Sequence, residues 1–312
     1  MQPIIFVIGG PTASGKSLAS QHLARNLKGI IINADSVQLY QELPLLTAKP
    51  TEEEMAYVPH RLYGKLTSQD TVTASLWTTW TWQEIEKTHL YKKIPLIVGG
   101  SGFYLKALME GLSPMPEIPH EIRMRGQTIR QEQGLAILFD VLQRQDPESA
   151  KKLSPNDAHR ILRAWEVWEA TGIPLSVWQR QQSSDASKIQ NYKFVKIFIN
   201  PARSQLYQRI NERVLKMMDR GALGEVKNLL ELNITLPHPL QKAVGVHELS
   251  QYLKGCISYD EAIHQMQTKT RQYAKRQITW FSHQFKADLT YPFLYEEAAF
   301  ERFAQDHNLQ NF

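Results

Sequence analysis

The sequence has only one cysteine, Cys256, among 312 residues. One thiol can close no internal disulfide and build no thiolate zinc site, which is typical of proteins from a reducing compartment. No apolar run approaches the roughly 18 residues that a membrane span requires. The short run at residues 4–8 has no Lys or Arg before it and does not resemble a secretory signal. We therefore expect a cytoplasmic protein without a membrane partner. We also expect it to be a monomer.

Internal repeats and low-complexity tracts are also absent, and acidic residues are slightly fewer than basic ones, giving a net charge of +5. Such mild basicity selects no partner by itself, because the position of the charges matters more than their sum. Residues 269–287 hold five Lys or Arg and no Asp or Glu, with four aromatic residues between them. This stretch predicts either an RNA contact surface or an amphipathic helix with its aromatics in the core, and Lys275 and Arg276 are its candidate RNA contacts.

Continuous apolar runs predict strands at residues 4–8, 30–32, 95–98 and 194–199, with helix-like stretches between the first of them. This order predicts an α/β fold, a P-loop NTPase-like parallel sheet flanked by helices. Three prolines at 113–119 and a polar stretch at 183–187 enclose a segment without strand signals. We therefore expect a core of residues 1–112 and 187–312 and an all-helical inserted subdomain at 113–186. After residue 199 we expect only helices, the last one long and opened by Ser258 with Glu261.

The strongest motif lies between the first strand and the first helix and matches the P-loop pattern G-x-x-x-x-G-K-[ST]. It consists of Gly10, Pro11, Thr12, Ala13, Ser14, Gly15, Lys16 and Ser17. Glycines let successive backbone N–H groups point at an anion, and the helix N-terminus adds its dipole. Lys16 supplies a positive charge, and Ser17 is a candidate Mg²⁺ ligand. The motif predicts a polyphosphate with Mg²⁺ and leaves open which polyphosphate it is.

The third strand ends in Gly99 and Gly100, where many P-loop kinases and ATPases have a magnesium-binding aspartate. This argues against a small-molecule or nucleotide kinase, which is the main alternative. The acidic residue is instead Asp35, just past the carboxyl end of the second strand, where ligands of such folds bind. Asp35 is thus a candidate Mg²⁺ ligand, catalytic base or helix N-cap. Arg209 and Arg213, one helical turn apart, suit either a polyphosphate or a solvated helix face.

Five segments together resemble the tRNA dimethylallyltransferase family, also called tRNA isopentenyltransferase or IPP transferase, of the bacterial type. They are residues 34–40 (ADSVQLY), 47–51 (TAKPT), 98–108 (VGGSGFYLKAL), 154–163 (SPNDAHRILR) and 271–280 (RQYAKRQITW). Their order and spacing fit the family from about residue 3 to about residue 283. The resemblance implies transfer of a dimethylallyl group from its pyrophosphate to N6 of the adenosine next to the anticodon of tRNA.

The resemblance also implies residue roles. Asp35 would be the general base, and Ser101 would support the pyrophosphate in place of the family's usual Thr. The tRNA contacts would include Asp35, Ser36 and Gln38, the last of them on the target adenine. The helical insertion would clasp the anticodon stem-loop through His159, Arg160 and Arg163. The third possibility, a non-catalytic RNA-binding P-loop protein, would tolerate loss of Asp35.

Overall fold

The computed structural model describes residues 2–181, 183, 185–232, 234 and 238–309. The chain divides into two compact units, residues 1–109 with 190–312 and residues 110–189. The second unit lies within three residues of the expected insertion at 113–186, of which Gln182 and Ser184 lie outside the described residues. Within the described ranges no helix is both long enough and apolar enough to cross a membrane.

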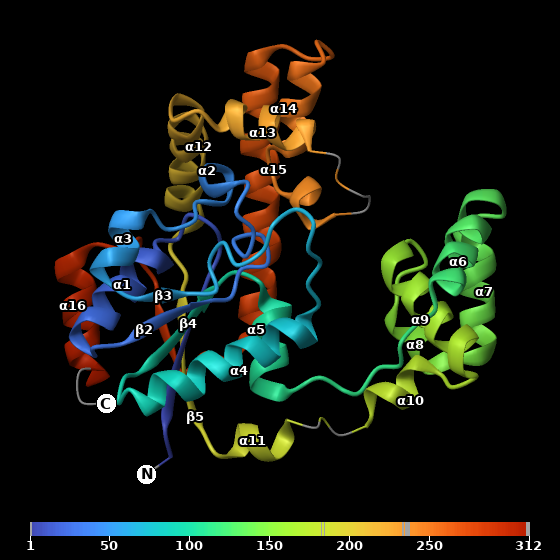
Figure 1. The fold of residues 1–312 in the computed structure, drawn as a ribbon, viewed down its shortest axis with the longest axis horizontal. Coiled ribbons are helices and arrows are strands. Elements are labelled where there is room, and N and C mark those ends of the chain that lie inside the picture. Colours follow the sequence, from blue (N-terminus) through green and yellow to red (C-terminus); the bar gives the residue numbers. More distant parts are fainter. Residues whose placement is uncertain (1, 182, 184, 233, 235–237, 310–312) are drawn as a thin grey trace. The chain divides into compact units, whose positions relative to one another are not determined.

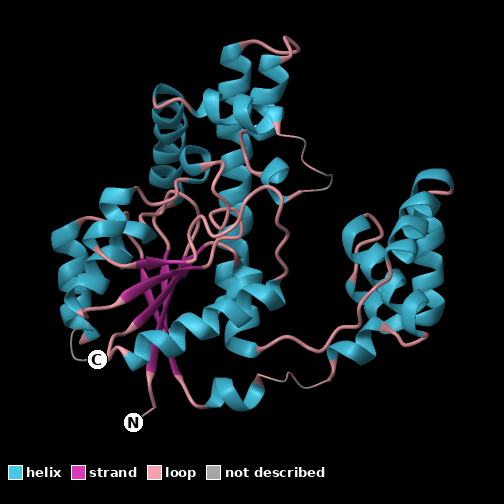
Figure 2. Cartoon of the chain, viewed as in Figure 1, coloured by secondary structure: helices cyan, strands magenta, loops and turns pink. Residues whose placement is uncertain are grey.

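The first unit is built on one six-stranded parallel sheet with the order β3-β2-β4-β1-β5-β6 (Figures 1 and 2). Its strands are β1 (Ile4–Gly9), β2 (Ile30–Asn33), β3 (His60–Arg61), β4 (Pro95–Gly99), β5 (Lys193–Ile199) and β6 (Leu289–Tyr291). The predicted α/β fold with a parallel sheet is confirmed. The expectation that only helices follow residue 199 is wrong, because β6 adds an edge strand. At three residues, β6 is too short to produce a hydrophobic pattern.

Helices cover both faces of this sheet (Figure 2). The helices of this unit are α1 (Lys16–Asn26), α2 (Pro44–Thr47), α3 (Glu52–Tyr57), α4 (Ala74–Leu90), α5 (Gly102–Glu110), α12 (Arg203–Asp219), α13 (Ala222–Glu231), α14 (Val246–Leu253), α15 (Tyr259–Trp280) and α16 (Glu297–Asp306), of which α13 and α14 lie beyond the sheet (Figure 1). On one face Ile8 packs with Leu23 of α1 and Phe300 of α16. On the other face Phe198 of β5 stacks on Phe281, where α15 continues as a π-helical turn.

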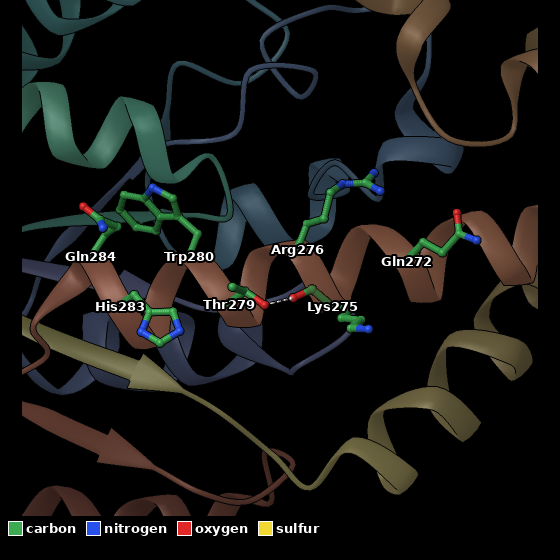
Figure 3. Close-up of a pocket in the computed structure, with 7 residues that line it drawn as sticks. All are labelled: Gln272, Lys275, Arg276, Thr279, Trp280, His283 and Gln284. Atoms are coloured by element: carbon green, nitrogen blue, oxygen red, sulfur yellow. Dashed lines mark hydrogen bonds between the residues drawn. The ribbon is translucent and has the colours of Figure 1, made fainter. Parts of the chain in front are cut away.

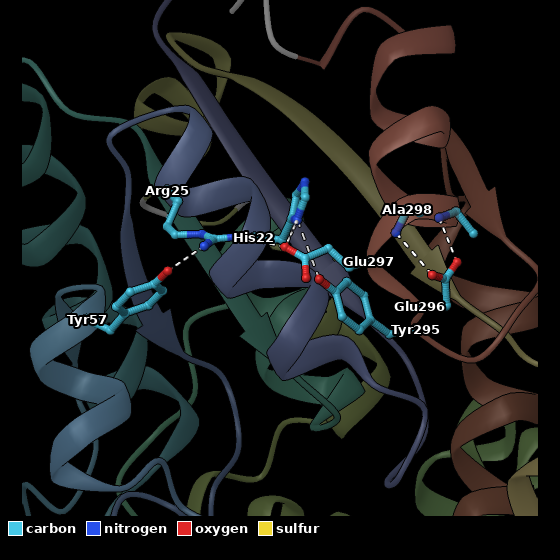
Figure 4. A network of polar contacts seen from close by, with 8 residues as sticks. His22, Arg25, Tyr57, Tyr295, Glu296, Glu297 and Ala298 are labelled. Carbon is cyan, nitrogen blue, oxygen red and sulfur yellow. Dashed lines mark hydrogen bonds and ion pairs between the residues drawn. The ribbon is translucent and has the colours of Figure 1, made fainter.

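The long helix α15 begins as expected, since the Ser258 side chain accepts a hydrogen bond from the Glu261 N–H at 3.2 Å. It is not the final helix, because α16 follows β6. Figure 4 shows how this last segment joins α1: Tyr295 Oη lies 3.4 Å from His22 Nδ1, and Arg25 pairs with Glu297 at 3.2 Å. The C-terminal segment therefore completes the apolar layer over α1.

The second unit is helical throughout, as expected for the insertion. Its helices are α6 (His120–Glu132), α7 (Leu135–Gln145), α8 (Pro147–Lys152), α9 (Ala158–Thr171) and α10 (Leu175–Gln179), with α11 (Ala186–Gln190) at its end. Asp157 caps α9 by accepting from the Arg160 N–H, and Gly172 ends it with φ of 68°. Ile161 and Trp165 are buried on one side of α9, so this small domain has a core of its own.

Candidate active site

The phosphate loop connects β1 to α1 and turns sharply, with φ of 63° at Ala13 and 92° at Gly15. A Cβ on Gly15 would lie 2.7 Å from Tyr295 Cβ, so this position needs glycine for both conformation and space. Lys16 Nζ donates to the Pro11 carbonyl at 3.3 Å and so lies over its own loop. Ser17 is exposed in the first turn of α1. The loop thus has the strand–loop–helix context of an anion site.

Packing beneath the loop fixes it to the rest of the sheet. Ala13 is buried against Leu206 and Ile210 of α12 and Ala274 of α15. From α15, the buried Gln277 side chain accepts from the Thr12 N–H at 2.8 Å and donates to the Gly100 carbonyl at 3.0 Å. One side chain therefore connects the phosphate loop to the turn that follows β4.

The two arginines of α12 both face the phosphate loop. Arg213 Nη1 donates to Thr12 Oγ1 at 3.3 Å, and Arg209 Nη1 lies 3.5 Å from the place a Cβ would take on Gly15. Burial is the main cause that lowers the pKa of Arg213 to about 10, with the charge of Asp35 opposing the shift and that of Arg209 adding to it. Arg213 remains charged at neutral pH, so three cations including Lys16 surround the loop.

Asp35 lies past the end of β2, in a polar turn. Its carboxylate Oδ1 accepts from the Val37 N–H at 3.1 Å, and the Ser36 N–H donates to Ser101 Oγ at 3.1 Å. Residues 36–39 form turns, so Asp35 caps no helix there. The structure therefore brings Asp35, Ser36 and Ser101 together at the carboxyl edge of the sheet.

A cavity of about 350 Å³ contains Asp35 together with the phosphate-loop residue Thr12. Its other polar lining residues are Ser36, Thr47, Arg213, Lys242, Thr270, Tyr273 and Arg276. Its apolar lining residues are Val37, Leu46, Ile210, Val214, Met217, Pro239, Ala243, Val244 and Met266. The volume is within the range of small-molecule sites, and the mixture of apolar walls with a few polar groups is typical of them.

Asp35 is the one acidic residue among the lining residues, and its charge reaches several neighbours. Burial lowers the pKa of Lys16 to about 8, against an opposing effect of Asp35. Burial also raises the pKa of Tyr273 and Tyr63 well above the usual range, and the negative charge of Asp35 adds to both shifts. Both phenols therefore stay neutral and keep their O–H donors.

Gln38 lies on the same turn as Asp35, and its side chain is tied to the short helix α2. Its Nε2 donates to the carbonyl oxygens of Thr47 at 2.7 Å and Ala48 at 3.0 Å. Both partners are carbonyl oxygens, which can only accept, so the amide atom that faces them is the nitrogen and not the oxygen. The amide is fixed in one orientation by these two bonds.

The basic and aromatic stretch of the sequence forms the last turns of α15 and the π-helical turn that follows it. Figure 3 shows the residues that line a surface groove there: Gln272, Lys275, Arg276, Thr279 and Trp280 of α15, with His283 and Gln284 of the π-helical turn. Lys275 and Arg276 are exposed, whereas Phe281 and Phe285 are buried. The aromatic residues Phe281 and Phe285 therefore belong to the core, and the RNA contact of the exposed basic side remains a prediction. Arg276 also lines the cavity with Asp35, so it borders both hollows.

The remaining predicted contacts lie in the helical unit, on α9. His159 and Arg160 are exposed, while Arg163 is half-buried beside Glu166, 3.9 Å away. Burial lowers the pKa of Arg163 and raises that of Glu166, each opposed by the partner's charge. Arg160 also pairs with Asp157 at 3.4 Å, so each arginine of α9 has an acidic neighbour.

The comparisons with known proteins agree with this geometry. The sequence profile of the family described as IPP transferase matches residues 38–284. The chain belongs to the IPP transferase family. A tRNA dimethylallyltransferase from Chelativorans sp. (strain BNC1) is 45% identical over 282 residues, which cover 90% of this chain and 96% of the relative. One from Rhodospirillum centenum is 42% identical over 283 residues, with 91% and 90% covered.

Solved structures of IPP transferases resemble the whole chain. A eukaryotic dimethylallyltransferase acting on tRNA superposes with a TM-score of 0.82 at 26% identity, covering 99% of this chain and 80% of that one. The full-length tRNA isopentenylpyrophosphate transferase of Bacillus halodurans gives a TM-score of 0.69 at 29% identity, with 100% and 97% covered. Membership of this family argues against the alternative of a small-molecule or nucleotide kinase.

Two residues that support this IPP transferase site, Gln277 and Glu225, are not among those predicted from the sequence. Gln277 is a polar residue on the buried side of α15, between Ala274 and Phe281 at helical spacing. That position in the pattern is a usable signal, because a buried polar side chain requires partners. Glu225 of α13 accepts hydrogen bonds from the backbone of α2. Its partners are 180 residues earlier in the chain, so no local pattern indicates them.

Proposed function

We propose that this chain transfers a dimethylallyl group from dimethylallyl pyrophosphate to N6 of the adenosine next to the anticodon of tRNA. The observation that carries the proposal is the shared cavity, in which Asp35 and the phosphate-loop residue Thr12 line one space with apolar walls. The reaction needs those three features: an anion cradle for the diphosphate, an apolar space for the five-carbon chain, and a base facing the acceptor.

The diphosphate of the donor would bind the loop of residues 10–17. Negative charge grows on this leaving group as its C–O bond breaks, so prearranged cations lower the barrier. Lys16 and Arg213 are available for that role, with Arg209 beside Gly15. The apolar lining residues Ile210, Val214 and Met217 offer a suitable surface for the dimethylallyl group.

The acceptor nitrogen would approach Asp35. Its lone pair attacks C1 of the dimethylallyl group, the C–O electron pair leaves with pyrophosphate, and one N6 proton passes to the Asp35 carboxylate. An exocyclic amine is a weak nucleophile, so a base that removes this proton assists the step. Ser101 lies beside Ser36 and is proposed to reach the pyrophosphate from that side.

Magnesium fits this site as a metal shared with the substrate. The described residues contain no cluster of three or more His, Cys, Asp or Glu that would cage a metal alone. Mg²⁺ commonly binds through one or two protein oxygens together with substrate phosphates. Ser17 is the proposed protein ligand, and the ion would supply charge neutralisation for the departing pyrophosphate.

The tRNA would contact both units. An adenine within a stack cannot be alkylated at N6, so the base must leave the stack and enter the cavity. Gln38, Ser36, Lys275 and Arg276 are the proposed contacts of the core. His159, Arg160 and Arg163 are the proposed contacts of the helical unit, which would clasp the anticodon stem-loop. We propose a monomer, which light scattering of the purified protein would test.

The decisive experiment is mass analysis of nucleosides from tRNA incubated with the protein, Mg²⁺ and dimethylallyl pyrophosphate. We expect N6-isopentenyladenosine at the position next to the anticodon, with release of one pyrophosphate per product. A parallel incubation with ATP should show no tRNA-dependent consumption of nucleotide. Unmodified adenosine together with consumption of ATP would overturn the proposal.

A further inference from the structure

We propose that Glu225 is a positioning residue that fixes Gln38, through helix α2, in the orientation that accepts a hydrogen bond from the amino group of the target adenine. The inference rests on the proposed function. Glu225 is far from the phosphate loop in the chain and touches no group that reacts. Its effect would pass through two sets of hydrogen bonds.

The first set joins Glu225 to the start of α2. Its Oε1 accepts from the Leu45 N–H at 2.6 Å and its Oε2 from the Leu46 N–H at 3.0 Å. Glu225 is half-buried, and α13 is in contact with α2. Hydrogen bonds to a charged acceptor are stronger than neutral ones, and a helix N-terminus favours a negative charge. Glu225 therefore holds both N–H groups of this turn.

The second set joins the end of α2 to Gln38. Both Gln38 amide hydrogens have acceptors, the Thr47 and Ala48 carbonyls. No group in the described part of the chain donates to Gln38 Oε1. The side chain therefore has an acceptor to offer a ligand and no free donor. An adenine presents a donor at its exocyclic amine, whereas a guanine presents an acceptor at the same position.

The turn between the two sets needs support from outside. Ala48 has φ of 50°, a left-handed conformation that is unfavourable for a residue with a Cβ. Leu46 packs against Gly245, where a Cβ would lie 2.9 Å from Leu46 Cδ2. Leu46 and Thr47 line the cavity that contains Asp35. Movement of α2 would therefore disturb both the Gln38 amide and the cavity wall.

The test compares binding of two fluorescent anticodon stem-loops, one with adenine and one with guanine at the target position. The parent should prefer adenine. In Glu225→Ala this preference should fall by about tenfold, which corresponds to one lost hydrogen bond at the base. Affinity for inorganic pyrophosphate should stay within about twofold, because the phosphate loop has separate supports. Glu225→Gln keeps one acceptor oxygen, so its preference for adenine should fall less than that of Glu225→Ala.

A double-mutant cycle separates positioning from general loosening. Gln38→Ala should reduce the adenine preference as much as Glu225→Ala, and the double variant should lose no more than either single one. Glu231→Ala, exposed at the end of the same helix, is the matched control and should behave as the parent. Equal weakening of both stem-loops, or additive losses, would overturn the inference. If Glu225→Ala does not fold, the adenine preference and the double-mutant cycle are measured with Glu225→Gln and judged in the same way.

The parent protein distinguishes this inference from the proposed function. Suppose that the parent makes N6-isopentenyladenosine and that Glu225→Ala keeps the full preference for adenine. These two results would refute only the role of Glu225. A parent that binds the stem-loops and produces no alkylated adenosine refutes the proposed function, and the positioning role falls with it.

Discussion

The two ends of the cavity are built in different ways. The donor end is the phosphate loop, whose residues 10–17 are consecutive and stand between a strand and a helix. The acceptor end combines Asp35 and Gln38 with α2, which is held by Glu225 of α13. A continuous segment carries its own geometry, whereas an assembled one depends on packing between distant parts of the chain. This difference predicts which substitutions affect one end of the cavity alone and which affect distant parts of the structure.

The largest effect should come from Asp35→Ala, at the acceptor end. Removing the base should lower turnover by about 10²-fold or more, since general base catalysis contributes that much. Affinity for tRNA and for the donor should stay near that of the parent, because neither requires the proton transfer. Single-turnover rates and stem-loop binding would measure both quantities. Unchanged turnover would remove Asp35 from the chemistry, and a parallel loss of donor affinity would show that the two ends are not independent.

The next effect concerns Lys16 and the donor end, and it depends on pH. Burial lowers the pKa of Lys16 from 10.5 to about 8, so the charge is present below about pH 8 and lost above it. The donor KM should therefore rise with pH above 8, by up to about tenfold per unit. In Lys16→Met this pH dependence should disappear, with a high KM throughout.

Above pH 8, where the affinity for the donor should fall, the stability of the folded protein should rise. Between pH 8 and 10.5 the unfolded chain holds a proton on Lys16 that the folded protein has released. The free energy of unfolding should therefore rise with pH there, relative to Lys16→Met. Urea unfolding of both proteins at several pH values would measure the difference. Parallel pH profiles would show that Lys16 is not desolvated.

Sequence reasoning recovered the local parts of this molecule. It located the four strands of the sheet centre, since residues buried on both faces form continuous apolar runs, and it located the phosphate loop by its glycines. It missed β3, β6 and α16, because strands of two or three residues produce no period and α16 packs only after β6 has joined the sheet. The roles at the acceptor end came from family resemblance. Glu225 has no local signal because its partners lie far along the chain, whereas the buried position of Gln277 is a signal that does not reveal its partners.

Gln277 connects the phosphate loop to the turn after β4, so its substitution should affect the donor end through packing. Gln277→Met keeps the volume and leaves the Thr12 N–H and the Gly100 carbonyl without their partner. The free energy of unfolding should fall by about 2 kcal/mol, and the donor KM should rise by about tenfold or less. Gln272→Met, exposed on the same helix, is the control for denaturant unfolding. A stability equal to that of the control would mean that the loop does not need this side chain.

The smallest effect should come from Lys275 and Arg276, which are exposed on the outer side of α15 (Figure 3). If both contact tRNA phosphates, each replacement by Ala should weaken binding a few-fold at low salt. Each should also reduce the slope of log affinity against log salt by about one. The loss should therefore shrink as salt is raised, because fewer counterions are released on binding. Lys269→Ala removes an exposed charge of the same helix that lies outside the groove and should keep the parent slope. If the slope of log affinity against log salt is unchanged in Lys275→Ala and Arg276→Ala, the RNA does not contact these residues. The groove that they line then has no role in binding the acceptor.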